Sequence, residues 1–192
     1  MSKQPYSPYN NTSGRFRKNM LYWSGGFTLL LLVILRLLDQ SLTIEGTPDG
    51  IVGFELVKNI HDARIMIDMW GEHGRLIAAF SLGIDYVFLI SYALFLGLCS
   101  YEIGKKLSGR SKLLSRPGFW LSWLMLLAAI YDSIENYSLI KILTGSKSQL
   151  WATTSYYFST IKFAIVFVTL IYIVLGLVMI WITAEPSKKQ QV

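Results

Sequence analysis

Two hydrophobic stretches of this chain carry acidic side chains, which are able to pair with cations, share protons or act in acid–base catalysis. The first stretch contains Asp85, with Tyr92 seven residues further on, and the second contains Asp132, Glu135 and Asn136. Residues three, four or seven positions apart share one face of a helix. A carboxylate at the centre of a membrane helix costs roughly 2.5 to 3.5 kcal/mol on insertion scales. We therefore expect these acids to face the interior of a helical bundle.

The two stretches run in opposite directions, which brings their acids to similar depths. At a rise of about 1.5 Å per residue, Asp85 lies roughly 14 Å and Asp132 roughly 12 Å below the outer ends of their spans. We expect these two carboxyl groups to face each other in the outer half of the bundle. Glu135 and Asn136 then lie one turn nearer the outside, and Tyr92 completes a candidate intramembrane polar site.

Three physical arrangements of this site remain open at the level of the sequence. The carboxyl groups could share protons, pair with a cation, or accept hydrogen bonds from Tyr and Ser hydroxyls on other helices. The cation could be a bound metal ion, or one of the arginines near the outer boundary, Arg36, Arg64 or Arg75. The same residues are compatible with an interhelical clamp, with a ligand, ion or proton site, and with acid–base catalysis.

Motifs of catalysis are absent from the rest of the sequence. A membrane-embedded zinc hydrolase would need several histidines, and the chain has only His61 and His73, both outside the hydrophobic stretches. Their spacing matches no standard metal motif, and neither a G-x-S-x-G nucleophile nor a Walker A loop occurs. We therefore assign no catalytic residue and no metal ligand, and the sequence leaves the cofactor open.

The elements that must position these residues are membrane-spanning helices. A span needs about 20 predominantly apolar residues, and four such stretches occur, at about 21–38, 76–100, 119–140 and 161–182. The predicted fold is an all-α integral membrane protein, a four-helix bundle in which residues 1–192 form a single membrane domain. We expect the first span to stay uncleaved, because Arg36 and Asp39 follow its apolar core where a signal peptide has small residues.

Composition agrees with a membrane protein. The 192 residues are 53% hydrophobic and 16% charged, whereas soluble domains carry about 25% charged residues. The single cysteine, Cys99, excludes a disulfide within the chain. The net charge of +6 is divided among loops next to the membrane, where anionic lipid head groups account for it. We therefore expect the bilayer as a partner and no nucleic acid.

The distribution of lysine and arginine predicts the orientation. Basic residues flank the first span on its N-terminal side and fill the loop between the second and third spans (Lys3, Arg15, Arg17, Lys18, Lys105, Lys106, Arg110, Lys112 and Arg116). The segment 39–75 instead holds seven of the twelve acids. Because basic residues favour the cytoplasmic side, we expect both termini in the cytoplasm and the segment 39–75 outside.

The outward segment is predicted to form one short amphipathic helix, from about Ile60 to Trp70. Asn59 is a suitable N-cap, Gly71 follows as a stop signal, and apolar residues recur at helical spacing between them. We expect this helix to lie on the outer surface or to cap the bundle. Its terminal tryptophan, Trp70, is expected to be an aromatic anchor at the membrane interface.

Three motifs together resemble a group of uncharacterised bacterial membrane proteins with about four spans. They are G-I-x-x-F-E-L at 50–56, I-D-Y-x-F-x-x-x-Y at 84–92 and D-x-x-E-N at 132–136, and the resemblance covers roughly residues 50–141. This chain departs from the group at 58–60, where Lys-Asn-Ile replaces a small residue followed by Thr-Pro. The resemblance implies a bacterial inner membrane and implies no activity, substrate or cofactor.

Two classes of function fit these observations. The first is a non-enzymatic membrane protein, either an accessory subunit of a membrane protein partner or a binder of a small ligand at the polar site. The second is an ion- or proton-coupled transporter or a membrane-embedded enzyme that uses Asp85, Asp132 and Glu135. Four spans are few for a transporter acting alone, and the halves of the chain show no repeat. This favours the first class or a homo-oligomer.

Overall fold

The computed structural model describes residues 6–184, and the part of the chain that it describes forms five α-helices. They are α1 (Gly14–Asp39), α2 (Gly50–Glu55), α3 (Ile60–Leu107), α4 (Lys112–Leu143) and α5 (Gln149–Ala184). All but α2 are long and apolar enough to cross a membrane. The prediction of an all-α bundle with four spans is confirmed, and the chain is a multi-pass membrane protein. The helices extend beyond the predicted spans at both ends.

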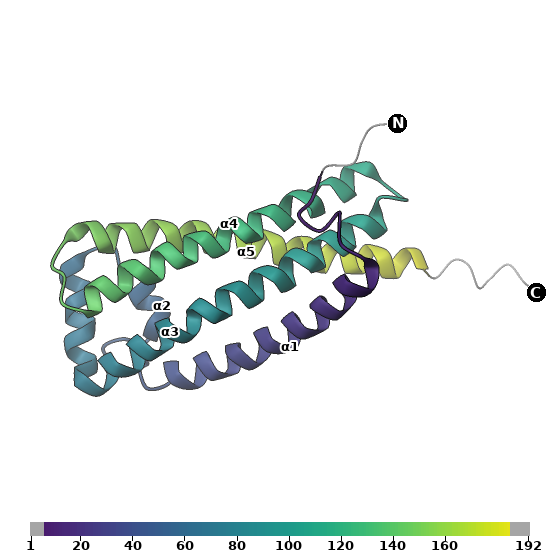
Figure 1. Cartoon of the computed structure of the whole chain (residues 1–192). Helices are drawn as coiled ribbons and strands as arrows, with labels where there is room; N and C mark the ends of the chain where they lie inside the picture. The colour runs from purple at the N-terminus through teal and green to yellow at the C-terminus, as the bar shows by residue number, and fades with distance from the viewer. Residues whose placement is uncertain (1–5, 185–192) are drawn as a thin grey trace, which may run out of the picture.

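α3 is two helices joined at a break. Gly71 has φ 62° and ψ −166°, a conformation outside the helical region, which a residue with a Cβ adopts only at a cost. The residues before it, 60–70, lie across one end of the four long helices and are called the cap (Figure 1). The side chain of Asn59 caps this segment by accepting a hydrogen bond from the His61 amide at 2.9 Å. The predicted short helix and its stop signal are therefore confirmed, and the helix caps the bundle.

The cap is held by a hydrophobic core that it shares with the adjoining ends of the long helices. Phe54 of α2 packs edge-on against Trp70, with ring centroids 5.3 Å apart. The expectation that Trp70 anchors the protein at the membrane interface is wrong, because this side chain is only 7% exposed. Its indole N–H donates to the Leu42 carbonyl at 2.9 Å and to the Thr47 hydroxyl at 3.0 Å. Trp70 therefore ties the loop after α1 to the cap.

The long helices pack around α3, which contacts α1, α4 and α5. α3 and α4 approach closely at Gly104 and Gly118, where a Cβ on Gly118 would clash with the Ser100 carbonyl. α1 lies at the edge of the bundle and packs chiefly against α3 (Figure 1). This arrangement leaves α1 and α5 separated on one side of the molecule.

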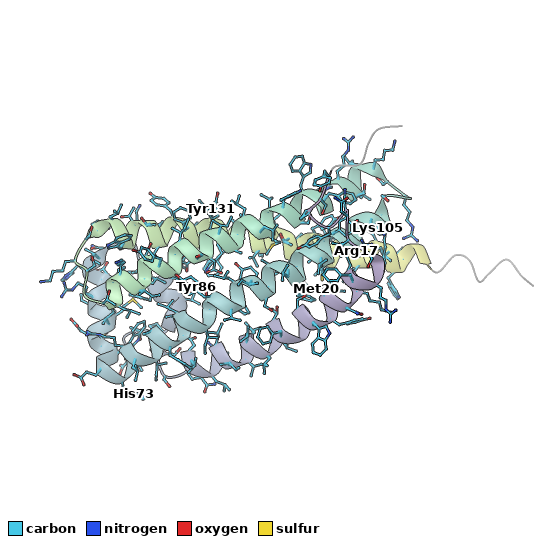
Figure 2. All side chains as sticks on the ribbon, viewed as in Figure 1. Arg17, Met20, His73, Tyr86, Lys105 and Tyr131 are labelled. Carbon is cyan, nitrogen blue, oxygen red and sulfur yellow. The ribbon has the colours of Figure 1, made fainter. Side chains whose placement is uncertain are left out.

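The opposite end of the bundle is fastened by the residues around the start of α1. Arg17 is 6% exposed, and its Nε lies 2.7 Å from Oε1 of Glu102 on α3. Its guanidinium group also lies over the Tyr101 ring, 5.2 Å from the centroid. Figure 2 shows Arg17 and Lys105 at this end and His73 at the end with the cap. Arg17, which in the sequence is only one of the basic residues that predict the orientation, therefore also forms a structural ion pair.

Candidate functional site

A buried lysine is the centre of the polar site. Lys162 of α5 is 6% exposed. Its Nζ lies 2.8 Å from Glu135 Oε2, 2.9 Å from Asp132 Oδ1 and 3.5 Å from Glu55 Oε2. The three carboxylates come from two different helices, α2 and α4. Lys162 therefore joins α2, α4 and α5 through ion pairs inside the bundle.

Helical spacing places the α4 members of the site on one face. Asp132, Glu135 and Asn136 are all buried, with exposures of 2%, 0% and 0%. Tyr92 of α3 donates its hydroxyl proton to Asp132 Oδ2 at 2.8 Å. The Asn136 amide donates to Oδ2 of Asp85, also on α3, at 2.6 Å. The structure thus brings all five residues of the predicted polar site into one group.

Glu55 enters the site from the segment between the first two spans. Its carbonyl oxygen accepts hydrogen bonds from the hydroxyls of Ser155 and Ser159, each at 3.1 Å, which pins the end of α2 to α5. The start of α2 is held by Asp39, whose Oδ1 accepts the Ile51 amide proton at 2.8 Å. Burial raises the pKa of the Glu55 carboxyl above its usual range, and the Lys162 ammonium offsets only part of this effect.

Two acceptor atoms of the site are buried without a hydrogen-bond donor. Within residues 6–184, Oε1 of Glu135 and Oδ1 of Asn136 have no such partner, whereas Oε2 of Glu135 has the Lys162 ammonium 2.8 Å away. A buried polar atom that lacks a partner costs about 1 to 3 kcal/mol. Carboxyl and amide oxygens therefore outnumber the donors that the described residues supply.

A cavity of about 460 Å³ reaches this polar site. Its floor contains Asp85, Asp132, Lys162 and Glu55, together with Tyr92. Its walls are mostly apolar and come from both sides of the gap in the bundle, with Leu32 and Leu35 from α1 and Val166 and Leu170 from α5. Volumes of roughly 300 to 1,000 Å³ are typical of small-molecule sites. The cavity therefore combines an apolar body with a charged end.

The arginines proposed as partners lie away from this group. Arg36 lines the cavity, but its guanidinium group pairs with Asp39 at 2.8 Å. Arg75 lies 3.9 Å from Asp68 in a pair exposed to solvent. Arg64 is in the cap, and within residues 6–184 it forms no ion pair with the carboxylates around Lys162. The cation of the site is Lys162.

Sequence reasoning missed Lys162 and Glu55. Lys162 is the second residue of the predicted fourth span, and a lysine at a span end usually extends to the interface. A lone lysine in the most apolar span is nevertheless a signal from which an ion pair with the buried acids could have been predicted. Glu55 lies in the G-I-x-x-F-E-L motif, but nothing in the sequence distinguishes it from the other acids of the outward segment. Its approach to Lys162 depends on the folding of α2 into the bundle end.

No grouping of three or more His, Cys, Asp or Glu side chains suited to a metal ion occurs within residues 6–184. His61 and His73 are both exposed. The carboxylates of the site surround an ammonium group in place of a metal ion.

Comparisons with protein-family models, with curated proteins and with solved structures found no match for this chain.

Proposed function

We propose that this membrane protein is a non-enzymatic binder of a small amphiphilic molecule, which it holds in the cavity above the Lys162 cluster. The observation that carries the proposal is the 460 Å³ cavity, which has apolar walls and a floor of ionisable groups. An apolar pocket with a few convergent polar groups is the usual form of a small-molecule site. A simple interhelical clamp would leave no such space beside its polar groups.

The route into the cavity is lateral. Leu32 of α1 and Leu170 of α5 line the cavity and are 51% and 43% exposed. In a membrane-embedded bundle, side chains exposed at this depth face lipid. A molecule dissolved in the bilayer can therefore enter between α1 and α5 with its apolar body still in contact with hydrocarbon.

A pair of tryptophan variants on α1 tests the proposal. Leu35→Trp places a bulky side chain in the cavity, whereas Leu37 is 59% exposed and does not line it. Native mass spectrometry of the gently solubilised protein should show a small-molecule adduct on the wild type and on Leu37→Trp, and a reduced adduct on Leu35→Trp. Equal adducts on both variants, or none on any of the three proteins, would contradict the proposal.

The same spectra distinguish the accessory-subunit and homo-oligomer hypotheses. A stoichiometric foreign subunit would make the chain part of a larger membrane complex, and a mass of two or more copies would show self-association. Neither result depends on the cavity, because both are read from the subunit masses and not from the small-molecule adduct.

Proton- or ion-coupled transport is the second candidate, and the arrangement around Lys162 favours it. Three carboxyl groups share one ammonium, so small movements of α2 could exchange protons among them. Purified protein in liposomes with a pH-sensitive dye inside would then show a proton flux, and Glu135→Gln would abolish it. No flux above that of empty liposomes would leave binding as the better account.

We propose a bacterial inner membrane with both termini in the cytoplasm, as the basic residues predict. Arg17 and Lys105 lie at one end of the bundle, and the cap with its acids lies at the other (Figure 2). Lysine and arginine enrichment at one end supports a cytoplasmic location for that end. The bacterial membrane rests on the resemblance of the three motifs alone.

A further inference from the structure

The floor of the cavity holds more carboxyl groups than cations. Glu55 and Asp132 line the cavity and pair with the Lys162 ammonium, which also pairs with Glu135. A further lining carboxyl group, Asp85, accepts a hydrogen bond from Asn136. Burying a charge away from water is costly unless an opposite charge or hydrogen bonds compensate it. Because carboxyl groups outnumber cations at this floor, one more positively charged group would be favourable there.

Asp85 is the carboxylate best placed to receive that group. It is half-buried and lines the cavity, whereas Asp132 and Glu135 are buried and occupied by Lys162. Asn136 donates to one oxygen of Asp85. Within residues 6–184, no lysine or arginine nitrogen lies within 4.0 Å of the Asp85 carboxylate. Asp85 thus presents to the cavity a carboxyl group that has no ion-pair partner among the described residues.

The walls decide what kind of cation fits. Leucine, isoleucine, phenylalanine and valine side chains make up just over half of the lining residues, including Phe88, Phe95 and Phe163. A hydrated inorganic cation gains nothing from such walls, and the described residues offer it no grouped ligands. An organic cation satisfies both parts of the cavity, because its body fills the apolar volume and its N–H groups donate to the carboxylate.

We propose that the ligand of this cavity is a hydrophobic amine, whose protonated nitrogen pairs with Asp85 and whose carbon body lies between α1 and α5. This inference rests on the proposed binding function and specifies its ligand class. The aromatic rings of Phe88 and Phe95 line the same space, and ring faces attract ammonium groups. Lys162 stays with Asp132 and Glu135 and repels a second cation from the deeper part of the floor.

Three unbranched ligands of ten carbon atoms each test the inference. Decylamine, decan-1-ol and decanoic acid are added in turn to the purified full-length protein, and bound fractions are measured by native mass spectrometry. Hydrogen bonds between charged groups are stronger than those between neutral groups, so decylamine should bind at least about tenfold more tightly than decan-1-ol. Decanoic acid should bind most weakly.

Variants connect that preference to Asp85. Asp85→Asn keeps the shape of the side chain and an oxygen for the Asn136 amide, and it should lose the preference for the amine. Asp68→Asn removes a carboxylate that is 76% exposed and outside the cavity, and it should bind like the wild type. If Asp85→Asn does not fold, the ranking of the three ligands on the wild type still decides the question.

The outcomes separate this inference from the proposed function. If decylamine and decan-1-ol bind equally and Leu35→Trp weakens both, the cavity binds amphiphiles but the ligand class is wrong. If decylamine is preferred equally by the wild type and Asp85→Asn, a group other than Asp85 recognises the amine and the inference fails. If none of the three ligands binds, the inference and the proposed function both fail.

Discussion

Lys162 shows how one residue can organise a site inside a membrane protein. Its ammonium touches carboxylates of α2 and α4, so removal of this single side chain would leave several buried acids without a cation. Breaking a buried ion pair from one side costs about 3 to 5 kcal/mol, although replacing the whole group by apolar residues can cost nothing. The cluster is therefore better understood as a determinant of specific geometry than as a source of net stability.

Two tyrosines differ in what their hydroxyls contact, and this difference predicts opposite effects of removing them. The Tyr9 hydroxyl is buried without a hydrogen-bond partner within residues 6–184, and burial raises its pKa to about 12. Tyr92 donates to Asp132. We expect Tyr9→Phe to raise the free energy of unfolding by up to about 1 kcal/mol, and Tyr92→Phe to lower it by about 1 to 3 kcal/mol. Unfolding by sodium dodecyl sulfate in mixed micelles measures both, and a loss of stability in Tyr9→Phe would refute the assignment.

Glu55 predicts a pH dependence of stability. Burial raises the pKa of this carboxyl in the folded protein above its ordinary value of 4.5, and Lys162 lowers it only in part. Between pH 4.5 and the raised pKa, the folded state holds a proton that the unfolded state has lost. The contribution of this group to stability therefore falls as the pH rises through that interval.

Glu55→Gln is neutral at every pH and should flatten this dependence. The melting temperature of Glu55→Gln minus that of the wild type should increase as the pH is raised from 5 to 8, when both are measured in detergent. Glu45→Gln replaces an exposed glutamate of the same outer segment and should run parallel to the wild type. A parallel curve for Glu55→Gln would show that the carboxyl titrates alike in both states.

At the scale of elements, the cap and α2 prepare the outer end of the cavity. The break at Gly71 turns residues 60–70 across the bundle end (Figure 1). Beneath it, α2 is pinned by Asp39 at its start and by two α5 hydroxyls at its end, which directs Glu55 inward. Ile51 and Val52 of α2 also line the cavity. A helix of six residues thus supplies part of the wall of the cavity because its neighbours hold it at both ends.

The conformation of Gly71 predicts the effect of adding a methyl group there. A Cβ on Gly71 would meet no atom within 4 Å, so Gly71→Ala costs only backbone strain, which is about 1 to 3 kcal/mol for this region of φ and ψ. Gly83 lies in the helical part of α3 and also has open space around its Cβ position. Gly83→Ala should be neutral or more stable by about 0.5 to 1 kcal/mol. Equal stability of the two variants would argue against the break.

At the scale of the whole molecule, the bundle is open on one side. α1 packs chiefly against α3, and the space between α1 and α5 is the cavity. A soluble protein would have to close such a gap or expose it to water, whereas a membrane protein can leave it to lipid. The proposed lateral access therefore depends on the arrangement of helices and on the bilayer together.

The orientation of the molecule gives a further prediction. In a Cys99→Ser background, we expect Ser148→Cys between α4 and α5 to react with a membrane-impermeant maleimide in intact cells. Gly109→Cys, between α3 and α4, should react only after the membrane is permeabilised. Both positions are exposed at the ends of the bundle, so access to the reagent is the only difference between them. The reverse pattern would place the termini outside.

Local patterns in the sequence determined the four spans, the capping helix and the polar faces of the second and third spans. These features depend on hydropathy, helical spacing and capping within about 20 residues, so Asp85, Tyr92, Asp132, Glu135 and Asn136 could be found without the structure. The structure decided which cation joins them and where the cavity lies. Lys162 pairs with acids 27, 30 and 107 residues away in the chain. Such contacts depend on how each helix is rotated about its axis against its neighbours, which no local pattern specifies.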